Sequence, residues 1–205
     1  TAIGFCSLYS NTTAADNTAV GACALNANTN AFYNTAVGSN ALLTNTTGAN
    51  NSAIGAFALD ANTTGSQNVA IGCDAMGANT EGSNHVAIGR RALDANTTGE
   101  QNVAIGSSAM TENTTGCHNT AVGFESLKNN TTGCQNTGIG RFALCATTTG
   151  QDNTATGFES GCKLTTGVEN AAYGYMAAKC GTTGNYNTSI GAAAGCQLTT
   201  GNNNT

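Results

Sequence analysis

A glycine recurs every seventeen residues along this chain, from Gly4 to Gly191, without insertion or deletion. It closes a phrase of the form NTAIG in twelve successive copies. Numbering the repeat from the Asn of this phrase gives the consensus N-T-A-I-G-x-x-A-L-x-x-N-T-T-G-x-x, with the glycine at position 5. So strict a period indicates one structural unit per repeat, with each unit stacked on its neighbours.

The length of the repeat constrains the unit. A pair of helices takes about thirty residues or more, and no segment has apolar residues at helical spacing. Short β-prone runs between Gly and Asn corners favour a strand in each repeat. The chain also contains no proline, which suits coils that donate backbone N–H groups to one another. The sequence predicts an all-β fold, a parallel β-solenoid or β-roll of twelve coils, about 55–60 Å long.

The repeats form a single array over residues 1–205, with variant coils over 154–205. Position 9 is Leu or Met in the first nine copies and small in the last three. The exceptional residues are Gly161, Ala178 and Gly195 at position 9, and Leu164 and Leu198 at position 12. We expect the core to be repacked there, with an altered core register. No capping segment is apparent, which suggests a window of a longer array or a subunit whose ends abut identical neighbours.

Cysteine returns to similar repeat positions in neighbouring coils. Eight of the nine cysteines form four such pairs: Cys6 with Cys23, Cys117 with Cys134, Cys145 with Cys162, and Cys180 with Cys196. Stacking places such residues about 4.8 Å apart, within the Cα range of disulfides. We therefore expect coil-to-coil disulfides and an oxidising, extracellular setting. Duplication of a cysteine-bearing repeat is the alternative, although it would explain one pair and not four at different positions. Cys73 has no neighbour and is expected to be free or to bond another chain.

The strand is expected at positions 2 to 4, for example Val103-Ala104-Ile105. Alternation puts positions 2 and 4 on one face and position 3 on the other. We expect the larger Val and Ile to face the core of the coil, which leaves Ala outside. An outer face held at Ala indicates close packing against other chains, such as a trimer around a three-fold axis. The alternative is that Ala simply fits a tight coil.

These phrases resemble known repeats. NTAIG followed by AL is similar to the head repeats of YadA-type trimeric autotransporter adhesins. NTAVGSNALLTNTTG, residues 34–48, resembles the shaft repeats of phage-type tail fibres that end in a self-cleaving chaperone domain. The resemblance extends over all twelve repeats and implies an extracellular, trimeric, left-handed β-roll acting as stalk, fibre or adhesin. The repeat is longer here than in YadA heads, where cysteines are unusual.

The Asn and Thr corners carry further signals. Asn at positions 1 and 12 can occupy left-handed corners and hydrogen-bond the Asn stacked on it. Among the Asn that match the glycosylation sequon, nine are candidate sites: Asn11, Asn45, Asn50, Asn62, Asn96, Asn113, Asn129, Asn130 and Asn203. Either they carry glycans, or the Asn and Thr serve only the turn. The Thr rows at positions 13 and 14 are a distant indication of ice binding, although adjacent residues present at most one Thr to each face.

No catalytic, cofactor or metal site is predicted. His85 and His118 lie two coils apart, and we interpret them as surface or corner substitutions. The acidic residues are scattered and no calcium-roll phrase occurs. Six Lys and Arg in 205 residues argue against a nucleic-acid partner, and no apolar run is long enough to predict membrane insertion.

Two functions fit these observations. The first is a structural component of an extracellular or virion fibre, a disulfide-stapled rod whose partners are further copies of itself. The second is an adhesin or receptor-binding shaft that contacts surface glycans through aromatic residues at variable positions. These aromatics are Phe5, Phe57, Phe124, Phe142, Phe158 and Tyr186, and their scatter in the sequence favours tolerance over a site.

Overall fold

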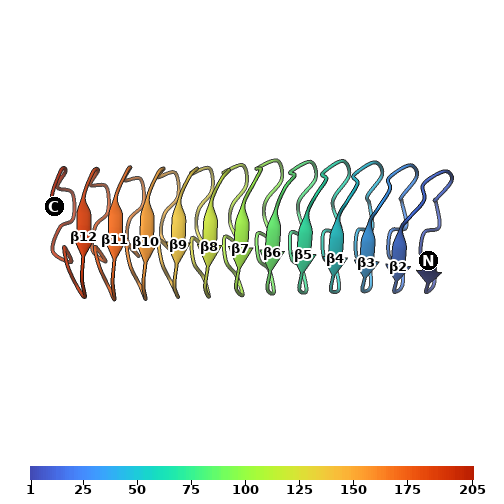
Figure 1. Ribbon diagram of the computed structural model, residues 1–205, viewed down its shortest axis with the longest axis horizontal. Helices are drawn as coiled ribbons and strands as arrows, with labels where there is room; N and C mark the ends of the chain where they lie inside the picture. The colour runs from blue at the N-terminus through green and yellow to red at the C-terminus, as the bar shows by residue number, and fades with distance from the viewer.

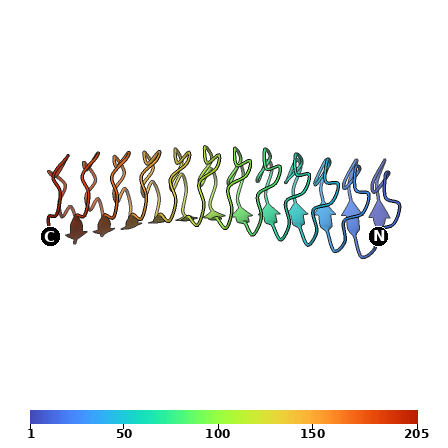
Figure 2. The same cartoon turned by 90° about the horizontal axis from the view of Figure 1, so that it is seen from above.

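The computed structural model describes residues 1–205 and confirms the parallel β-solenoid. Twelve short strands pair in sequence order, each residue with the one seventeen positions on, as Ala104 pairs with Ala121. The strands are β1 (Ala2–Ile3), β2 (Thr18–Val20), β3 (Thr35–Val37), β4 (Ser52–Ile54), β5 (Val69–Ile71), β6 (Val86–Ile88), β7 (Val103–Ile105), β8 (Thr120–Val122), β9 (Thr137–Ile139), β10 (Thr154–Thr156), β11 (Ala171–Tyr173) and β12 (Thr188–Ile190). The coils form one row with the termini at opposite ends (Figures 1 and 2). No helix capable of crossing a membrane is present.

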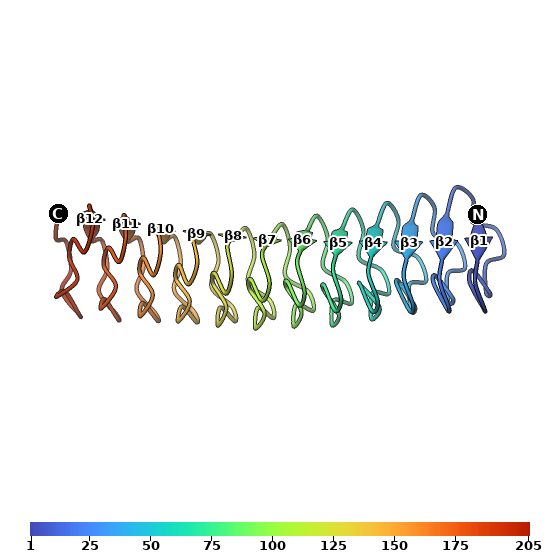
Figure 3. The ribbon, with the colours of Figure 1, turned by 90° about the horizontal axis from the view of Figure 1, so that it is seen from below.

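Each coil turns at four corners where the backbone has a positive φ. Position 5 is always Gly, with φ between 121° and 144°, a region that other residues rarely enter. Positions 7, 9 and 17 are left-handed in every coil, mostly with residues other than Gly, such as Leu93 with φ 55°. None of the four corners is at position 1 or 12, contrary to the expectation, and only position 17 is adjacent to an Asn position. Figure 3 shows the same sequence of turns repeated from coil to coil.

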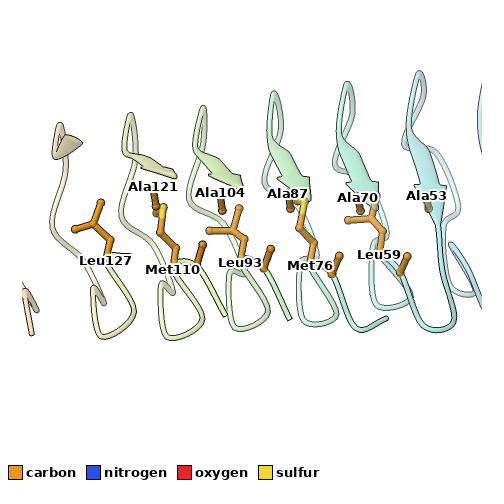
Figure 4. Close-up of a cluster of buried hydrophobic side chains, with 14 of the residues drawn as sticks. Ala53, Leu59, Ala70, Met76, Ala87, Leu93, Ala104, Met110, Ala121 and Leu127 are labelled. Carbon is orange, nitrogen blue, oxygen red and sulfur yellow. The ribbon is translucent and has the colours of Figure 1, made fainter. Parts of the chain in front are cut away.

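The side chains of the strands point in the direction opposite to the one expected. Ala at position 3 is buried, whereas Val and Ile at positions 2 and 4 point outward, so Ala104 is fully buried and Ile105 is 37% exposed. Inside the coil, position 3 meets Leu or Met of position 9 (Figure 4). The space inside the coil is narrow: where Ser126 replaces the usual Ala of position 8, a methyl group added at Gly138 would lie 2.7 Å from Ser126 Oγ. The expectation of a trimer rested on Ala facing outward, and this premise is wrong because the Ala side chains point inward.

Two columns of buried Asn complete the core. At position 12, each amide from Asn28 to Asn130 donates to the Oδ1 of the Asn one coil earlier, at 2.7–3.2 Å. The same amide nitrogen donates to a carbonyl in its own coil, as Asn62 does to Gly65 at 2.9 Å. At position 1, the backbone N–H donates to the preceding Asn, as in Asn51 to Asn34 Oδ1 at 2.9 Å. Burial of these polar groups is tolerated because they are hydrogen-bonded.

The last three coils keep the strand register and change the filling of the core. Thr154 still pairs with Ala171, so the path of the chain is continuous. Gly161 provides no side chain at position 9, and Leu164 at position 12 is buried in its place. The loss of the position-9 side chain leaves a small cavity, and Leu144, Gly161 and Leu164 are among the residues that line it. The filling of the core therefore differs in this coil, while the backbone register of the strands is unchanged.

Candidate functional site

The outer face of the sheet is an uncharged stripe that is apolar at position 4, except for Thr156, and mostly Thr or Ser at position 2; we call it the apolar stripe. Positions 2 and 4 of β2–β12 carry only Thr, Ser, Val, Ile, Ala and Tyr. Several of these side chains are well exposed, including Ile139 at 41%, Tyr173 at 42% and Ile190 at 72%. The in-register pairing of the strands makes the stripe continuous along the rod. Contiguous exposed apolar side chains of this kind mark an interaction surface.

The structure brings two of the four expected cysteine pairs into sulfur contact. The Sγ atoms are 3.0 Å apart in Cys117 and Cys134, and 3.1 Å apart in Cys145 and Cys162. All nine cysteines are free thiols. The cysteines without a sulfur–sulfur hydrogen bond are Cys6, Cys23, Cys73, Cys180 and Cys196. Disulfide formation stays a prediction, which the adjacent thiols favour most at the first two pairs.

Burial divides the sequon asparagines into two groups. Five belong to the buried column at position 12: Asn45, Asn62, Asn96, Asn113 and Asn130. Their amide nitrogens donate to Asn and Gly oxygens within the core, so a glycan there is incompatible with the folded coil. The remaining four, exposed or half-buried, are Asn11, Asn50, Asn129 and Asn203. A structural role accounts for the first group, and glycosylation stays a prediction for the second.

His85 is buried and takes the place of a position-1 Asn, whereas His118 is exposed. The backbone N–H of Asn102 donates to His85 Nδ1 at 3.1 Å, and Nε2 lies 2.7 Å from the carbonyl oxygen of Gly99. A neutral ring protonated at Nε2 satisfies both contacts, as the oxygen and nitrogen of an amide would. Burial lowers the pKa of His85 to about 4, because the charged ring would lose solvation. His118 is exposed at the left-handed corner of position 17 and fits the interpretation as a surface or corner residue, whereas buried His85 at position 1 does not.

Four aromatic side chains and one arginine from neighbouring coils gather at one corner. We call this cluster the aromatic patch, and it consists of Phe124, Arg141, Phe142, Phe158 and Tyr175. Ring centroids are 5.6 Å apart for Phe124 and Phe142, 6.5 Å for Phe142 and Phe158, and 5.5 Å for Phe158 and Tyr175. The guanidinium of Arg141 lies 4.6 Å from the centroid of Phe142 and within 5.9 Å of the other two Phe rings. These distances are those of cation–π contacts.

The patch revises the view that the aromatics are scattered. Phe124, Phe158 and Tyr175 share position 6, and Phe142 is at the adjacent position 7. Sequence reasoning missed Tyr175 and Arg141, although their common repeat position was a usable signal. The other three aromatics of the expected set lie outside the patch, with Phe5 78%, Phe57 43% and Tyr186 53% exposed. The repeat phase therefore groups residues that the linear sequence separates.

The two threonine rows have different roles. At position 13 the hydroxyl donates to the carbonyl of the next coil's position-13 Thr, as Thr114 does to Thr131 at 3.0 Å. Position 14, for example Thr115, is exposed. Only one Thr of each adjacent pair is free to face solvent, as its spacing predicts.

Charged side chains form isolated pairs. Arg91 contacts Asp94 at 2.8 Å and Lys128 contacts Glu125 at 3.2 Å. No group of three or more His, Cys, Asp or Glu side chains is arranged to hold a metal ion. Partly exposed pairs of this kind contribute little to stability.

The sequence matches no protein-family model, and no curated protein or solved structure is detectably similar to it.

Proposed function

We propose that this chain is a structural component of an extracellular or virion fibre. The observation that carries the proposal is the uninterrupted stack, in which β1 to β12 pair in sequence order and the termini lie at opposite ends (Figure 1). In such a stack each coil contacts only its neighbours, so length grows in proportion to the number of repeats. The fold is therefore suited to setting the distance between the two ends of the rod.

Cohesion along the rod supports the proposal. Strand pairing, the two Asn columns and the position-13 hydroxyls each tie one coil to the next. Disulfides at Cys117–Cys134 and Cys145–Cys162 would add covalent staples, each closing a loop of about seventeen residues. In the chain-entropy model such a loop stabilises by about 3 kcal/mol. Such staples belong to an oxidising environment.

We further propose that the fibre is a homo-oligomer joined through the outer apolar stripe. A second copy of this chain has the same coil spacing, so its ridges match those of the stripe along the whole rod. Oligomerisation would cover Val103, Ile105 and their equivalents, which the monomer leaves partly exposed. Burial of such side chains stabilises by about 25 cal/mol per Å².

Electron microscopy and mass measurement test the fibre proposal. The purified chain, secreted through an oxidising compartment, is expected to form straight rods about 55–60 Å long or filaments of such rods. Intact mass without reductant is expected to be lower by two hydrogens for each bridge. Compact or flexible particles would refute the rod, and a full complement of free thiols after secretion would refute the staples.

Charge substitution tests the oligomer. Val103→Lys and Ile105→Lys alter the stripe, whereas Thr115→Lys alters an exposed row of the same part of the rod. Light scattering is expected to report an oligomer for the wild type and the Thr115 variant, and a monomer for the stripe variants. A monomeric wild-type rod, or oligomers unaffected by both stripe variants, would count against this interface.

Recognition of surface glycans is a second candidate, favoured by the aromatic patch. Tyr175 is 56% exposed, and the following coil has only Ala192 at position 6. Exposed aromatic rings flanked by charged groups suit the apolar faces and hydroxyls of sugars.

A glycan array compares the wild type with Phe158→Ala and Tyr175→Ala, and Tyr186→Ala is the control at a distant corner. Binding that is lost only with the patch variants would favour recognition. Absence of binding in the wild type, or equal binding by all variants, would leave the patch without this function.

A further inference from the structure

Two thiols are held side by side on adjacent coils at position 10. Cys145 Sγ lies 3.1 Å from Cys162 Sγ and 3.6 Å from the carbonyl oxygen of Cys162. Backbone hydrogen bonds flank the pair, from Leu144 to Ser160 at 3.0 Å and from Ala146 to Cys162 at 3.1 Å. Both side chains are half-buried. The coils thus fix the two sulfurs in contact while leaving them partly open to solvent.

The charges around this pair are asymmetric. Lys179 follows Cys162 at position 10 of the next coil, and Lys163 is the next residue in the chain. Glu159 forms an ion pair with Lys179, and Glu125, paired with Lys128, acts on the Cys145 side. Both ammonium groups favour a thiolate at Cys162, whereas Glu159 opposes it.

The acidities of the two thiols diverge accordingly. The hydrogen bond from Cys145 lowers the pKa of Cys162 to about 7, assisted by Lys179 and Lys163 and opposed by burial and Glu159. The pKa of Cys145 is raised, because its proton is held against Cys162 and the site is partly buried. A thiolate beside a protonated thiol is the arrangement that thiol–disulfide exchange requires.

The other contacting pair differs in its surroundings, because the backbone N–H of Cys117 donates to Cys134 Sγ at 3.1 Å. Cys117 and Cys134 have sulfurs 3.0 Å apart, again on adjacent coils. The hydrogen bond to Cys134, burial and the carboxylate of Glu100 raise the pKa of Cys117 to about 11. Cys117 therefore corresponds to Cys145, and it provides a protonated thiol in sulfur contact with which Cys162 can be compared.

We propose that Cys145 and Cys162 form a reactive dithiol, in which Cys162 is the attacking group and small-molecule or protein disulfides are the substrates. The proposal concerns one of the pairs assigned to staples under the proposed function, but it does not require that the other pairs be bridged or that the chain form a fibre.

The exchange proceeds in two steps. The Cys162 thiolate attacks one sulfur of a disulfide RSSR, the S–S bond breaks, and RS⁻ leaves as a mixed disulfide forms. Cys145 then loses its proton to solvent or to the released thiolate, and its sulfur attacks Cys162 Sγ and expels the second RS⁻. Two electrons pass from the pair to the reagent, giving one Cys145–Cys162 disulfide, one RSH and one RS⁻, and the RS⁻ takes a proton from solvent.

Pulse alkylation of the reduced, folded protein with iodoacetamide, followed by peptide mapping, measures the reactivity of each thiol. The larger thiolate fraction at a pKa of about 7 rather than about 11, partly offset by lower nucleophilicity, is expected to make Cys162 react roughly fifty- to a hundredfold faster than Cys117 at pH 7. Its rate is expected to be half-maximal near pH 7, and the difference to disappear in urea. Equal rates for the two thiols in the folded protein would overturn the proposal.

Substitutions test whether Lys179 makes Cys162 reactive and whether Cys145 carries out the second step of the exchange. Lys179→Gln is expected to slow Cys162 at pH 7 several-fold and to shift its pH profile upward. Lys128→Gln, at the same repeat position two coils from Cys162, is the matched control and is expected to change little. With oxidised glutathione, the wild type is expected to give the internal disulfide and Cys145→Ser to stop at the mixed disulfide. Equal effects of the two lysine variants, or no mixed disulfide in Cys145→Ser, would refute the assigned roles.

These outcomes separate the two proposals. A secreted protein with every thiol free would refute the disulfide staples. The reactive dithiol would still be supported if Cys162 in that protein reacts with iodoacetamide faster than Cys117. A protein secreted with all bridges formed, in which Cys162 is slow after reduction, would support the staples and refute the reactive dithiol.

Discussion

At the scale of single residues, the buried column of asparagines at position 12 ends at a defined point. Asn130 is its last member, since the next coil has Thr147 at position 12. Asn130 Oδ1 is buried and accepts no hydrogen bond, whereas the hydroxyl of Thr147 donates to the carbonyl of Leu164 at 3.0 Å. A buried acceptor without a donor destabilises the fold.

Thr147→Asn is expected to extend the column by one coil. Its amide can donate to Asn130 Oδ1, as each earlier member does to its predecessor, but its own Oδ1 then has no donor, because the next coil has Leu164 at position 12. We therefore expect the free energy of unfolding to change by less than about 1 kcal/mol. Chemical denaturation measures the change, with Thr149→Asn on the exposed row as control. A midpoint raised well above that of the control would mean that the unpaired oxygen at the end of the column is not the weakness inferred here.

His85 predicts a pH dependence of stability. Its pKa is about 4 in the folded chain and near 6.5 in an unfolded one. Between these values the unfolded state binds the proton and the folded state does not, so stability falls as the pH drops from 6.5 to 4. The loss amounts to about 3 kcal/mol, and none of it is present above pH 6.5.

His85→Asn restores the amide of the other coils and is expected to remove that loss. Denaturation at pH 7.5 and pH 4.5 measures it as a stability difference from the wild type that grows in acid. His118→Asn, at the exposed histidine, is expected to follow the wild type. Parallel pH curves for the wild type and His85→Asn would contradict the assigned burial of a neutral ring.

At the scale of one coil, the glycine of position 5 differs from the glycine of position 15. Gly106 has φ 138°, and a Cβ there would lie 2.5 Å from the carbonyl oxygen of Gly123. Position 15 has Ala14 and Ala31 in the first two coils, and its glycines have no positive φ. Position 5 therefore requires glycine because of both its backbone conformation and the stacked coil, whereas position 15 is restricted only by the space available to a side chain.

Gly106→Ala is expected to destabilise the rod by at least about 3 kcal/mol, because it combines a disfavoured φ with a backbone clash. Ser107→Ala is the control, since Ala occurs at position 6 in other coils, as Ala22 and Ala56. Thermal unfolding followed by circular dichroism compares them. A Gly106 variant as stable as the control would show that coils are free to separate at this corner.

At the scale of the whole molecule, the solenoid is not equally cohesive along its length. The coils of β3 and β10 are each third from an end. The β3 coil has Leu42 at position 9, whereas the β10 coil has Gly161, with a small cavity beside it. Local opening is easiest where buried apolar contacts are fewest.

We therefore expect amides of β10 to exchange with deuterium faster than those of β3, although both are equally far from a terminus. Hydrogen exchange with peptide resolution measures the difference in a monomeric sample. Equal protection would mean that Leu164 fully replaces the missing position-9 side chain.

The sequence by itself determined the solenoid and its register. Gly4 to Gly191 keep one phase, and a strand that slipped by a single residue would misplace every corner. The same phase identified Cys145 and Cys162 as neighbours, since equal positions stack whatever the shape of the coil. These features depend on periodicity alone, which is a property of the sequence.

Only the tertiary structure decided which side of the strand faces inward. Alternation separates Ala104 from Val103 and Ile105 without saying which is inside. The thickness of the coil settles it, because the position-9 side chain already fills the space and leaves room for one methyl group. Burial of the Asn113 amide and the meeting of Phe124, Phe142 and Phe158 around Arg141 likewise depend on how the coil bends between strands, because the left-handed corners set where each side chain points.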